Sequence, residues 1–193
     1  MKNISINVVG IGAESYPNGT TPLEILSSTK GIAKDTIICK VDDILTDLST
    51  SLTGDATVQF LDGKSKDGHS VLLHSTAHLM AQAVKRLYPK TKVTIGPYLE
   101  NRFYYDFDVE TPFTEQDLLK IEKEMLKISQ ENLEIVHEVK SRKEALKFFK
   151  KIGEDYKVEI INDLDKSEVL KVYAQGDFTD LCRGPHVPST GTI

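Results

Sequence analysis

Four residues with metal-binding or catalytic side chains occur in two pairs of identical spacing. Three residues separate His74 from His78 in HSTAHLMAQA, and three separate Cys182 from His186 in DLCRGPHV. Positions i and i+4 of a helix lie one above the other on the same face, so two imidazoles can reach one small target. Three imidazoles and a thiolate form a donor set that suits zinc. The spacing therefore raises the hypothesis of one shared site.

The alternative interpretation is that neither pair has a function. A single histidine on a helix, or a buried cysteine, is more often ordinary packing than a ligand. The chain has only two cysteines and five histidines, however, and four of these seven residues fall in the two pairs. His69 and His137 have no partner at such a spacing. The paired arrangement favours a common site.

The elements that would position these residues can be read from the region 71–193. An apolar periodicity predicts a helix from about residue 72 to 87, with both histidines at the edge of its apolar stripe. Strand patterns follow in KVTIGP and RFYYDFDV, where Phe103, Tyr105 and Phe107 alternate with polar neighbours. Tyr105 and Asp106 are thus expected on opposite faces of the strand.

Two further helices are predicted from their termini. Thr114 with Asp117, and Ser141 with Glu144, have the spacing of capping boxes, and Gly153 is placed to end the second helix. YKVEIIN and VLKVYAQGDFTDL then have the composition of strands, and the second leads into the segment with Cys182.

The first 62 residues alternate short strand patterns with turns. ISINVV, TIICKVDDIL and ATVQFLD predict strands, and PLEILSST predicts a helix capped by Thr21 with Pro22 in its first turn. The polar, glycine-containing stretch at 63–70 predicts a linker. We therefore expect an α+β protein with a small domain at 1–62 and a larger one at 71–193.

Composition limits the class of protein. The 193 residues are 39% hydrophobic and 27% charged, without a stretch apolar enough to cross a bilayer, so we expect a soluble protein with no membrane partner. The N-terminus lacks the pattern of a secretory signal, and Cys39 and Cys182 are too few for a disulfide framework. We expect a cytoplasmic location and reduced thiols.

The net charge of −5 is unevenly distributed. The first 62 residues are acidic, whereas basic residues cluster in KRLYPKTK and KSRKEALKFFKK. These clusters could contact phosphate groups, but a solvated helix face explains the second one equally well.

Four segments also carry a resemblance to a known family. HSTAHLMAQAVKRLYP, TIGPYLENRFYYDFD, YKVEII and FTDLCRGPHVPSTG resemble motifs of the N-terminal editing domain of bacterial-type threonyl-tRNA synthetases, and alanyl-tRNA synthetases share the histidine and cysteine pairs. Residues 1–62 resemble the TGS domain of that family, a ubiquitin-like β-grasp module, although Asp42 and Asp43 stand where Asn-Gly is common. The resemblance implies a β-grasp domain followed by an α/β editing domain with an antiparallel sheet and packed helices.

The function implied by this resemblance is an aminoacyl-tRNA ester hydrolase. Serine differs from threonine by one methyl group, worth only about 1–3 kcal/mol of discrimination, so mischarged seryl-tRNA(Thr) must be removed by a second site that excludes threonine. No signature of an ATP site or an anticodon-binding domain occurs in the sequence. We therefore expect an N-terminal fragment of an enzyme that ligates threonine to tRNA, with ATP and zinc used only in its missing catalytic domain and homodimerisation through missing domains. The alternatives are a free-standing editing factor and a non-catalytic RNA-binding or regulatory module.

The resemblance also implies roles for individual residues. The aminoacylated 3′ end of tRNA is the expected partner, with Arg183 near its phosphates and with His74 and Lys157 activating water and stabilising charge. The expected substrate-binding residues are His78, Gly96, Tyr105, Asp180, Cys182 and His186, with Asp180 facing the substrate ammonium. No metal is expected to be obligatory; if zinc is present, its ligands are His74, His78, Cys182 and His186.

Overall fold

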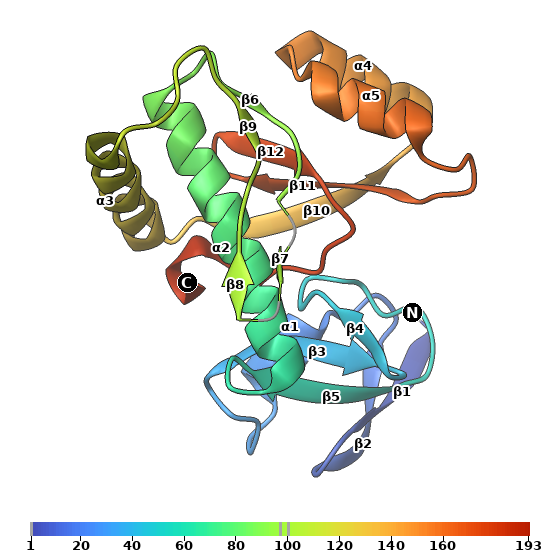
Figure 1. Ribbon diagram of the computed structural model, residues 1–193. Coiled ribbons are helices and arrows are strands. Elements are labelled where there is room, and N and C mark those ends of the chain that lie inside the picture. The colour runs from blue at the N-terminus through green and yellow to red at the C-terminus, as the bar shows by residue number, and fades with distance from the viewer. Residues whose placement is uncertain (1, 97, 100) are drawn as a thin grey trace. The chain divides into compact units, whose positions relative to one another are not determined.

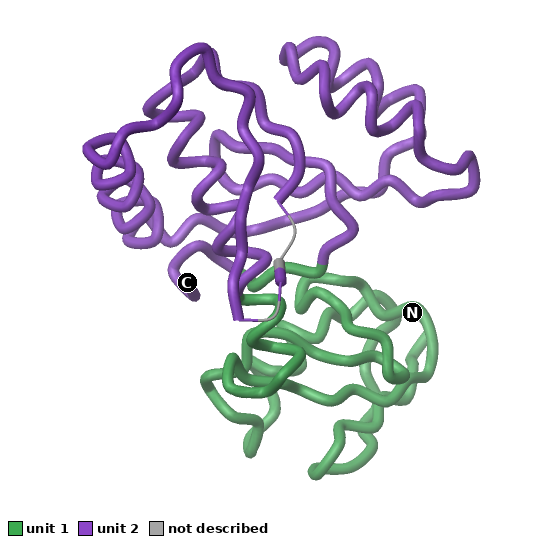
Figure 2. Tube along the Cα trace, in the orientation of Figure 1, with its two compact units in different colours: residues 1–72, 185–188 green, residues 73–184, 189–193 purple. Residues whose placement is uncertain are grey.

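The computed structural model describes residues 2–96, 98, 99 and 101–193 (Figure 1). The chain divides into two compact units, residues 1–72 with 185–188 and residues 73–184 with 189–193 (Figure 2). Both units combine helices with strands, which confirms the predicted α+β class. No helix in the described part of the chain has the length and apolar character needed to cross a membrane.

The first unit is built on a five-stranded sheet with the order β2-β1-β5-β3-β4. β1 and β5 are parallel and the other neighbours are antiparallel, which is the β-grasp arrangement that was predicted. Alternate residues of β1 are buried, so one face of the sheet covers the core. The strands are β1 (Asn3–Val8), β2 (Gly12–Pro17), β3 (Thr36–Val41), β4 (Ile44–Thr46) and β5 (Ala56–Asp62).

The helix of this unit, α1 (Pro22–Ser28), begins as predicted. Thr21 and Glu24 form a capping box, and Pro22 occupies the first turn. Ile25 is fully buried and packs with β-strand residues such as Ile6 and Val58 in a single apolar cluster.

The predicted linker is wrong in its local structure, because α2 (Lys66–Leu87) already begins at Lys66. The Ser65 hydroxyl accepts a hydrogen bond from the Gly68 amide at 3.1 Å, as an N-cap serine does. A Cβ at Gly68 would lie 1.9 Å from the Asp62 carbonyl oxygen, so glycine is required there by a close backbone approach. The glycine therefore belongs to a helix start, not to a flexible linker.

The second unit contains the three-stranded antiparallel sheet β10-β11-β12 and two short ribbons, β6 with β9 and β7 with β8. The ribbons are shorter than the predicted strands, and Pro97, at the end of KVTIGP, lies outside the described residues. The sheet strands are β10 (Ile135–Lys140), β11 (Leu170–Gln175) and β12 (Phe178–Leu181), and the ribbons are β6 (Lys92–Val93), β7 (Tyr98–Leu99), β8 (Arg102–Phe103) and β9 (Phe107–Asp108).

The helices of this unit are α3 (Glu115–Glu131), α4 (Arg142–Ile152) and α5 (Asp155–Asp163), followed by the 3₁₀ turn η1 (Thr190–Thr192). The capping boxes of α3 and α4 are present as predicted, and Gly153 ends α4 with φ of 77°. In α3, Ile121 and Ile128 are buried, and they pack against residues of α2 such as Leu79 and Val84.

YKVEIIN was predicted as a strand, and this prediction is wrong because the segment forms α5. Its β-branched residues favour a strand locally, but Lys157 and Ile161, four residues apart, are buried on one helical face. Arg142 of α4 donates hydrogen bonds to the Ile161, Leu164 and Asp165 carbonyl oxygens at the end of the helix. These tertiary contacts, far away in the sequence, override the local preference.

Candidate functional site

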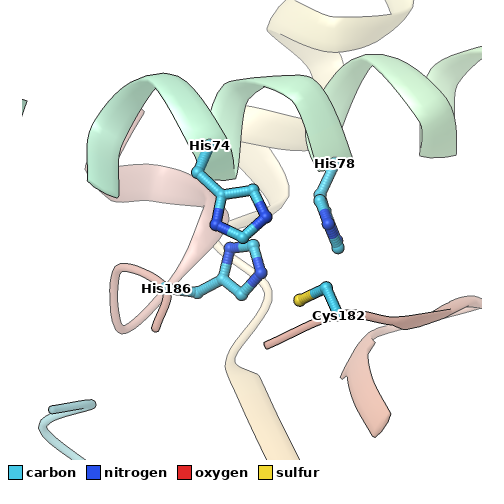
Figure 3. Close-up of side chains that lie close together, drawn as sticks. All are labelled: His74, His78, Cys182 and His186. Carbon is cyan, nitrogen blue, oxygen red and sulfur yellow. The ribbon is translucent and has the colours of Figure 1, made fainter. Parts of the chain in front are cut away.

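The four paired residues come together. One potential ligand atom from each of His74, His78, Cys182 and His186 can be chosen so that all lie within 4.8 Å of one another. Figure 3 shows the two imidazoles projecting from the same side of α2 towards the cysteine and the third histidine. The i,i+4 spacing on a regular helix is what aligns the first pair.

His78 occupies a tightly packed part of α2. Its side chain is only 3% exposed, and its ring contacts those of Tyr105 and Phe178 edge-on at centroid distances of 6.3 and 6.2 Å. The His74 ring stands at 89° to it with a centroid distance of 5.0 Å. Burial lowers the pKa of His78 well below its usual value, and the charges of His74 and Lys157 lower it further. His78 is therefore a neutral imidazole at neutral pH.

A buried ion pair lies beside this cluster. Lys157 of α5 and Asp180 of β12 are each 2% exposed at the side chain, and their Nζ and Oδ1 atoms are 2.6 Å apart. The Lys157 ammonium also donates to the Thr94 carbonyl at 2.5 Å and to the Tyr105 hydroxyl at 3.1 Å. An ammonium has three donors, and these contacts use all three. Lys157 is thus a fixed positive charge, unlike the solvated lysine that its local sequence suggests.

Tyr105 connects the two charged residues. Its hydroxyl donates to Asp180 Oδ2 at 2.5 Å, and burial, followed by the negative charge of Asp180, raises the tyrosine pKa well above its usual value. The predicted alternation of this segment is confirmed, because Tyr105 is buried and Asp106 is exposed. Gly96 packs against the tyrosine ring so closely that a Cβ there would lie 2.1 Å from a ring carbon. A larger residue at 96 would displace Tyr105.

The Asp180 carboxylate retains limited capacity for a further partner. Oδ1 accepts from Lys157 and from the Leu181 amide, the latter at 2.8 Å, and Oδ2 accepts from Tyr105. A carboxylate offers about four lone-pair positions, so these contacts occupy three of them. His78 Nε2 lies 3.6 Å from Oδ2. The fourth position can accept a donor from a bound molecule on the His78 side.

Glu154 is a buried residue whose importance the sequence did not reveal. It is 4% exposed, pairs with Lys85 of α2 at 2.7 Å and accepts a hydrogen bond from the Val93 amide at 3.3 Å. It thereby holds the first turn of α5, and with it Lys157, against α2 and β6. In the sequence, Glu154 stands between Gly153 and Asp155, where a charged residue is usually solvated. The Thr94 carbonyl was also missed, because sequence patterns carry no information on which backbone oxygen faces a site.

The two remaining predicted residues have different surroundings. Arg183 has a side chain that is 79% exposed, and its Nε pairs with Glu168 at 2.8 Å. His186 is buried at 2% exposure, and its backbone amide donates to Asp47 Oδ1 at 2.8 Å.

The donor set fits zinc by chemistry. Three imidazole nitrogens and one thiolate sulfur are common zinc ligands, and His78 is already in the neutral form that coordination requires. The chemistry of these four residues is therefore compatible with a bound zinc ion.

The class of protein follows from comparison with known families. Residues 170–193 match the family described as the threonyl and alanyl tRNA synthetase second additional domain. This stretch contains Asp180, Cys182 and His186, so the matched region includes part of the site. The chain therefore contains part of a domain found in aminoacyl-tRNA synthetases.

Individual threonine–tRNA ligases are similar in sequence to most or all of the chain. The chain is 48% identical over its full length to a threonine–tRNA ligase of Pelobacter propionicus, 49% identical over 92% of its length to that of Symbiobacterium thermophilum, and 51% identical over 85% to that of Alkalilimnicola ehrlichii. The chain spans only 26–30% of the length of these enzymes. The predicted resemblance to the threonyl-tRNA synthetase N-terminal region is thus confirmed.

Proposed function

We propose that this chain is the editing region of a threonine–tRNA ligase and hydrolyses seryl-tRNA(Thr). The observation that carries the proposal is the buried Lys157 ammonium beside the His74 and His78 pair, in a chain related over its full length to these ligases. Residues 71–193 would form the editing domain, and residues 1–62 a TGS-like domain that precedes it. Threonine ligation with ATP, and dimerisation, would reside in domains of the longer enzyme.

In the proposed reaction, water attacks the carbonyl carbon of the ester between serine and the terminal ribose. His74, which is partly exposed, orients this water and accepts its proton. The fixed charge of Lys157 stabilises the oxyanion that forms. The bond from the carbonyl carbon to the ribose oxygen then breaks, and the ribose hydroxyl leaves with a proton.

The other residues would bind the substrate. The substrate ammonium would use the remaining lone pair of Asp180 Oδ2, on the side of His78. Tyr105, held in place by Gly96, would limit the space for the amino-acid side chain, while Cys182 and His186 would contact serine or the ribose and Arg183 the phosphates. One methyl group must separate serine from threonine, which requires a rigid wall, and the aromatic packing around Tyr105 supplies one.

We propose that zinc is not obligatory for this reaction. If zinc binds, His74, His78, Cys182 and His186 would hold it. It would then supply a Lewis acid for the carbonyl or an acidified water. With His74 as the general base and Lys157 stabilising the oxyanion, the reaction needs neither a Lewis acid nor a metal-bound water.

The test is a deacylation time course of the chain with seryl-tRNA(Thr) and with threonyl-tRNA(Thr). Wild type should release serine much faster than threonine, and His74→Ala should lower kcat by about 10²–10⁴, the usual contribution of a general base. His69→Ala, a histidine on the same helix, is the matched control and should leave the rate unchanged.

Two outcomes would contradict the proposal. Equal rates on both esters would exclude a site that selects serine over threonine. An unchanged rate in His74→Ala would exclude His74 as the general base. Binding of tRNA without any hydrolysis, even with the remaining domains supplied in trans, would favour a non-catalytic RNA-binding module.

A further inference from the structure

Helix α4 carries a row of lysines that the proposed chemistry does not use. Its sequence, RKEALKFFKKI, has five basic residues and one acidic residue. At about 100° per residue, Lys143, Lys147, Lys150 and Lys151 fall within roughly a third of the helix circumference. We call these four residues the α4 lysine row. All four are exposed, while Ala145 and Phe149 on the opposite face are fully buried.

The two faces of α4 have different tasks. Ala145 and Phe149 pack into the apolar cluster with Ile161 of α5 and Leu170 and Val172 of β11. Arg142 is the basic residue outside the row, and it is accounted for by its hydrogen bonds to the end of α5. Figure 1 shows α4 beside α5, in agreement with their packing. The lysine row therefore faces away from the core.

Helix stability explains only part of the row, because only Lys150 and Lys151 lie in the last turn, where the helix dipole favours a positive charge. Lys143 lies in the first turn of α4, where the helix dipole disfavours a positive charge. Lys143 with Lys147, and Lys147 with Lys151, are like-charged i,i+4 pairs, each destabilising by about 0.2–0.5 kcal/mol. Within the described residues, no carboxylate forms an ion pair with any of the four lysines. The like-charged pairs therefore destabilise α4 locally, and no ion pair among the described residues offsets this effect.

Helix α3 provides the contrast within the same unit. Lys120, Lys123 and Lys127 also lie at helical spacing, here i, i+3 and i+7, but Lys120 pairs with Asp117 at 3.0 Å and Lys127 with Glu124 at 3.4 Å. The α3 sequence contains more acidic than basic residues. Of these two lysine-containing helices, α4 is the one whose lysines have no ion pair among the described residues, in a chain of net charge −5.

We propose that the α4 lysine row binds the phosphate backbone of the tRNA whose ester the site hydrolyses. This inference rests on the proposed function for the identity of the polyanion. Lysines spaced by about 6 Å along the helix axis suit a ligand with regularly repeated negative charges. A lipid surface is the poorer candidate, because the apolar face of α4 is buried against the unit and is not available for insertion.

The experiment compares two triple variants of the full chain for binding of deacylated tRNA(Thr) over a range of salt concentrations. Lys143→Gln/Lys147→Gln/Lys150→Gln, the row variant, removes three of the four charges of the row, and Lys120→Gln/Lys123→Gln/Lys127→Gln removes the same charge from α3. The first variant should bind at least about tenfold more weakly, and its log–log salt slope should be shallower by roughly 2, at about 0.7–0.9 per lost phosphate contact. The second should bind tRNA like wild type, and thermal unfolding should show that both variants remain folded.

Binding is measured without hydrolysis, so this result is independent of the proposed chemistry. If wild type hydrolyses seryl-tRNA(Thr) but the two triple variants bind tRNA alike, the lysine row is not the contact surface and the proposed function stands. If the row variant alone loses tRNA binding but wild type hydrolyses no ester, the row is supported and the proposed function fails. Loss of binding to anionic vesicles with tRNA binding retained would replace the proposal by a membrane surface.

A second readout uses the ester itself. For seryl-tRNA(Thr), the row variant should show a raised KM and an unchanged kcat, because the lysines do not touch the reacting atoms. For 3′-seryl-adenosine, which lacks the phosphate backbone, the row variant and wild type should have equal kcat/KM. A lowered kcat on both substrates would mean that α4 acts on the site through α5, not through RNA, and would overturn the proposal.

Discussion

At the scale of single residues, the site depends on two buried charges that need one another. Lys157 and Asp180 are each 2% exposed at the side chain, and further hydrogen bonds from Tyr105 and to Thr94 complete the network. Removing an ion from water costs several kcal/mol, which is compensated only while its partner is in place. Removing either residue therefore destabilises the folded protein, because the other is left as an unpaired buried charge.

We expect Lys157→Met to lower the free energy of unfolding by about 3–5 kcal/mol, because it leaves the Asp180 carboxylate buried without a cation. Adding Asp180→Asn should recover part of this loss, since the orphaned charge is then removed. Urea denaturation measures both values. Lys151→Met, an exposed lysine of α4, is the control and should change stability little. A double variant no more stable than Lys157→Met would show that the carboxylate is not the cause.

At the scale of elements, the β3–β4 hairpin carries a local strain. Its two-residue turn consists of Asp42 and Asp43, with φ of 48° and 65°. Both residues are thus in the left-handed region, where a two-residue hairpin turn prefers Asn-Gly. Asp42 is compensated because its Oδ1 accepts a hydrogen bond from the Thr57 amide at 2.8 Å. Asp43 is exposed and gains little in return.

Asp43→Gly should therefore stabilise the chain, by about 0.5–1 kcal/mol, because glycine adopts positive φ without a steric penalty. The shift in the urea midpoint measures it. Asp42→Gly relieves the same strain but loses the hydrogen bond to Thr57, so it should give no gain. A stabilisation equal in both variants would indicate that the contact to Thr57 contributes nothing.

At the scale of the whole molecule, a bound metal would affect the stability of the fold, because its ligands come from distant parts of the sequence. A metal held by His74, His78, Cys182 and His186 would close a loop of more than a hundred residues and so contribute to the stability of the entire fold. Structural zinc sites contribute on the order of 10 kcal/mol of apparent binding energy. Removal of such a metal would lower the melting temperature measurably.

We expect chelator-treated protein to keep its melting temperature and its deacylation rate, because the buried ammonium of Lys157 already supplies positive charge at the site. Cys182→Ser should lower the rate without releasing metal. The measurements are metal content, thermal unfolding and deacylation before and after chelation. About one zinc per chain, with activity lost on chelation and restored by zinc, would show that the metal is part of the mechanism.

The sequence by itself determined the features that depend on short-range chemistry. The capping boxes at Thr114 and Ser141 and the N-cap at Thr21 appear as predicted, because a cap is formed by side chains three residues from the groups they satisfy. The alignment of His74 with His78 follows from helical periodicity. The predicted alternation around Tyr105 is also present, although Tyr105 lies between β8 and β9 and not within a strand. The resemblance to a family then added Lys157, Gly96 and Asp180, which no local pattern distinguishes.

Tertiary structure decided what depends on distant partners. YKVEIIN is helical because Arg142 caps its end and the sheet packs against Ile161, although its β-branched residues favour a strand. Lys157 is a fixed, buried charge because Asp180, Tyr105 and Thr94 converge on its ammonium from other elements. Burial and pairing are properties of an environment that the chain creates only when it folds, so no stretch of sequence around a residue contains them.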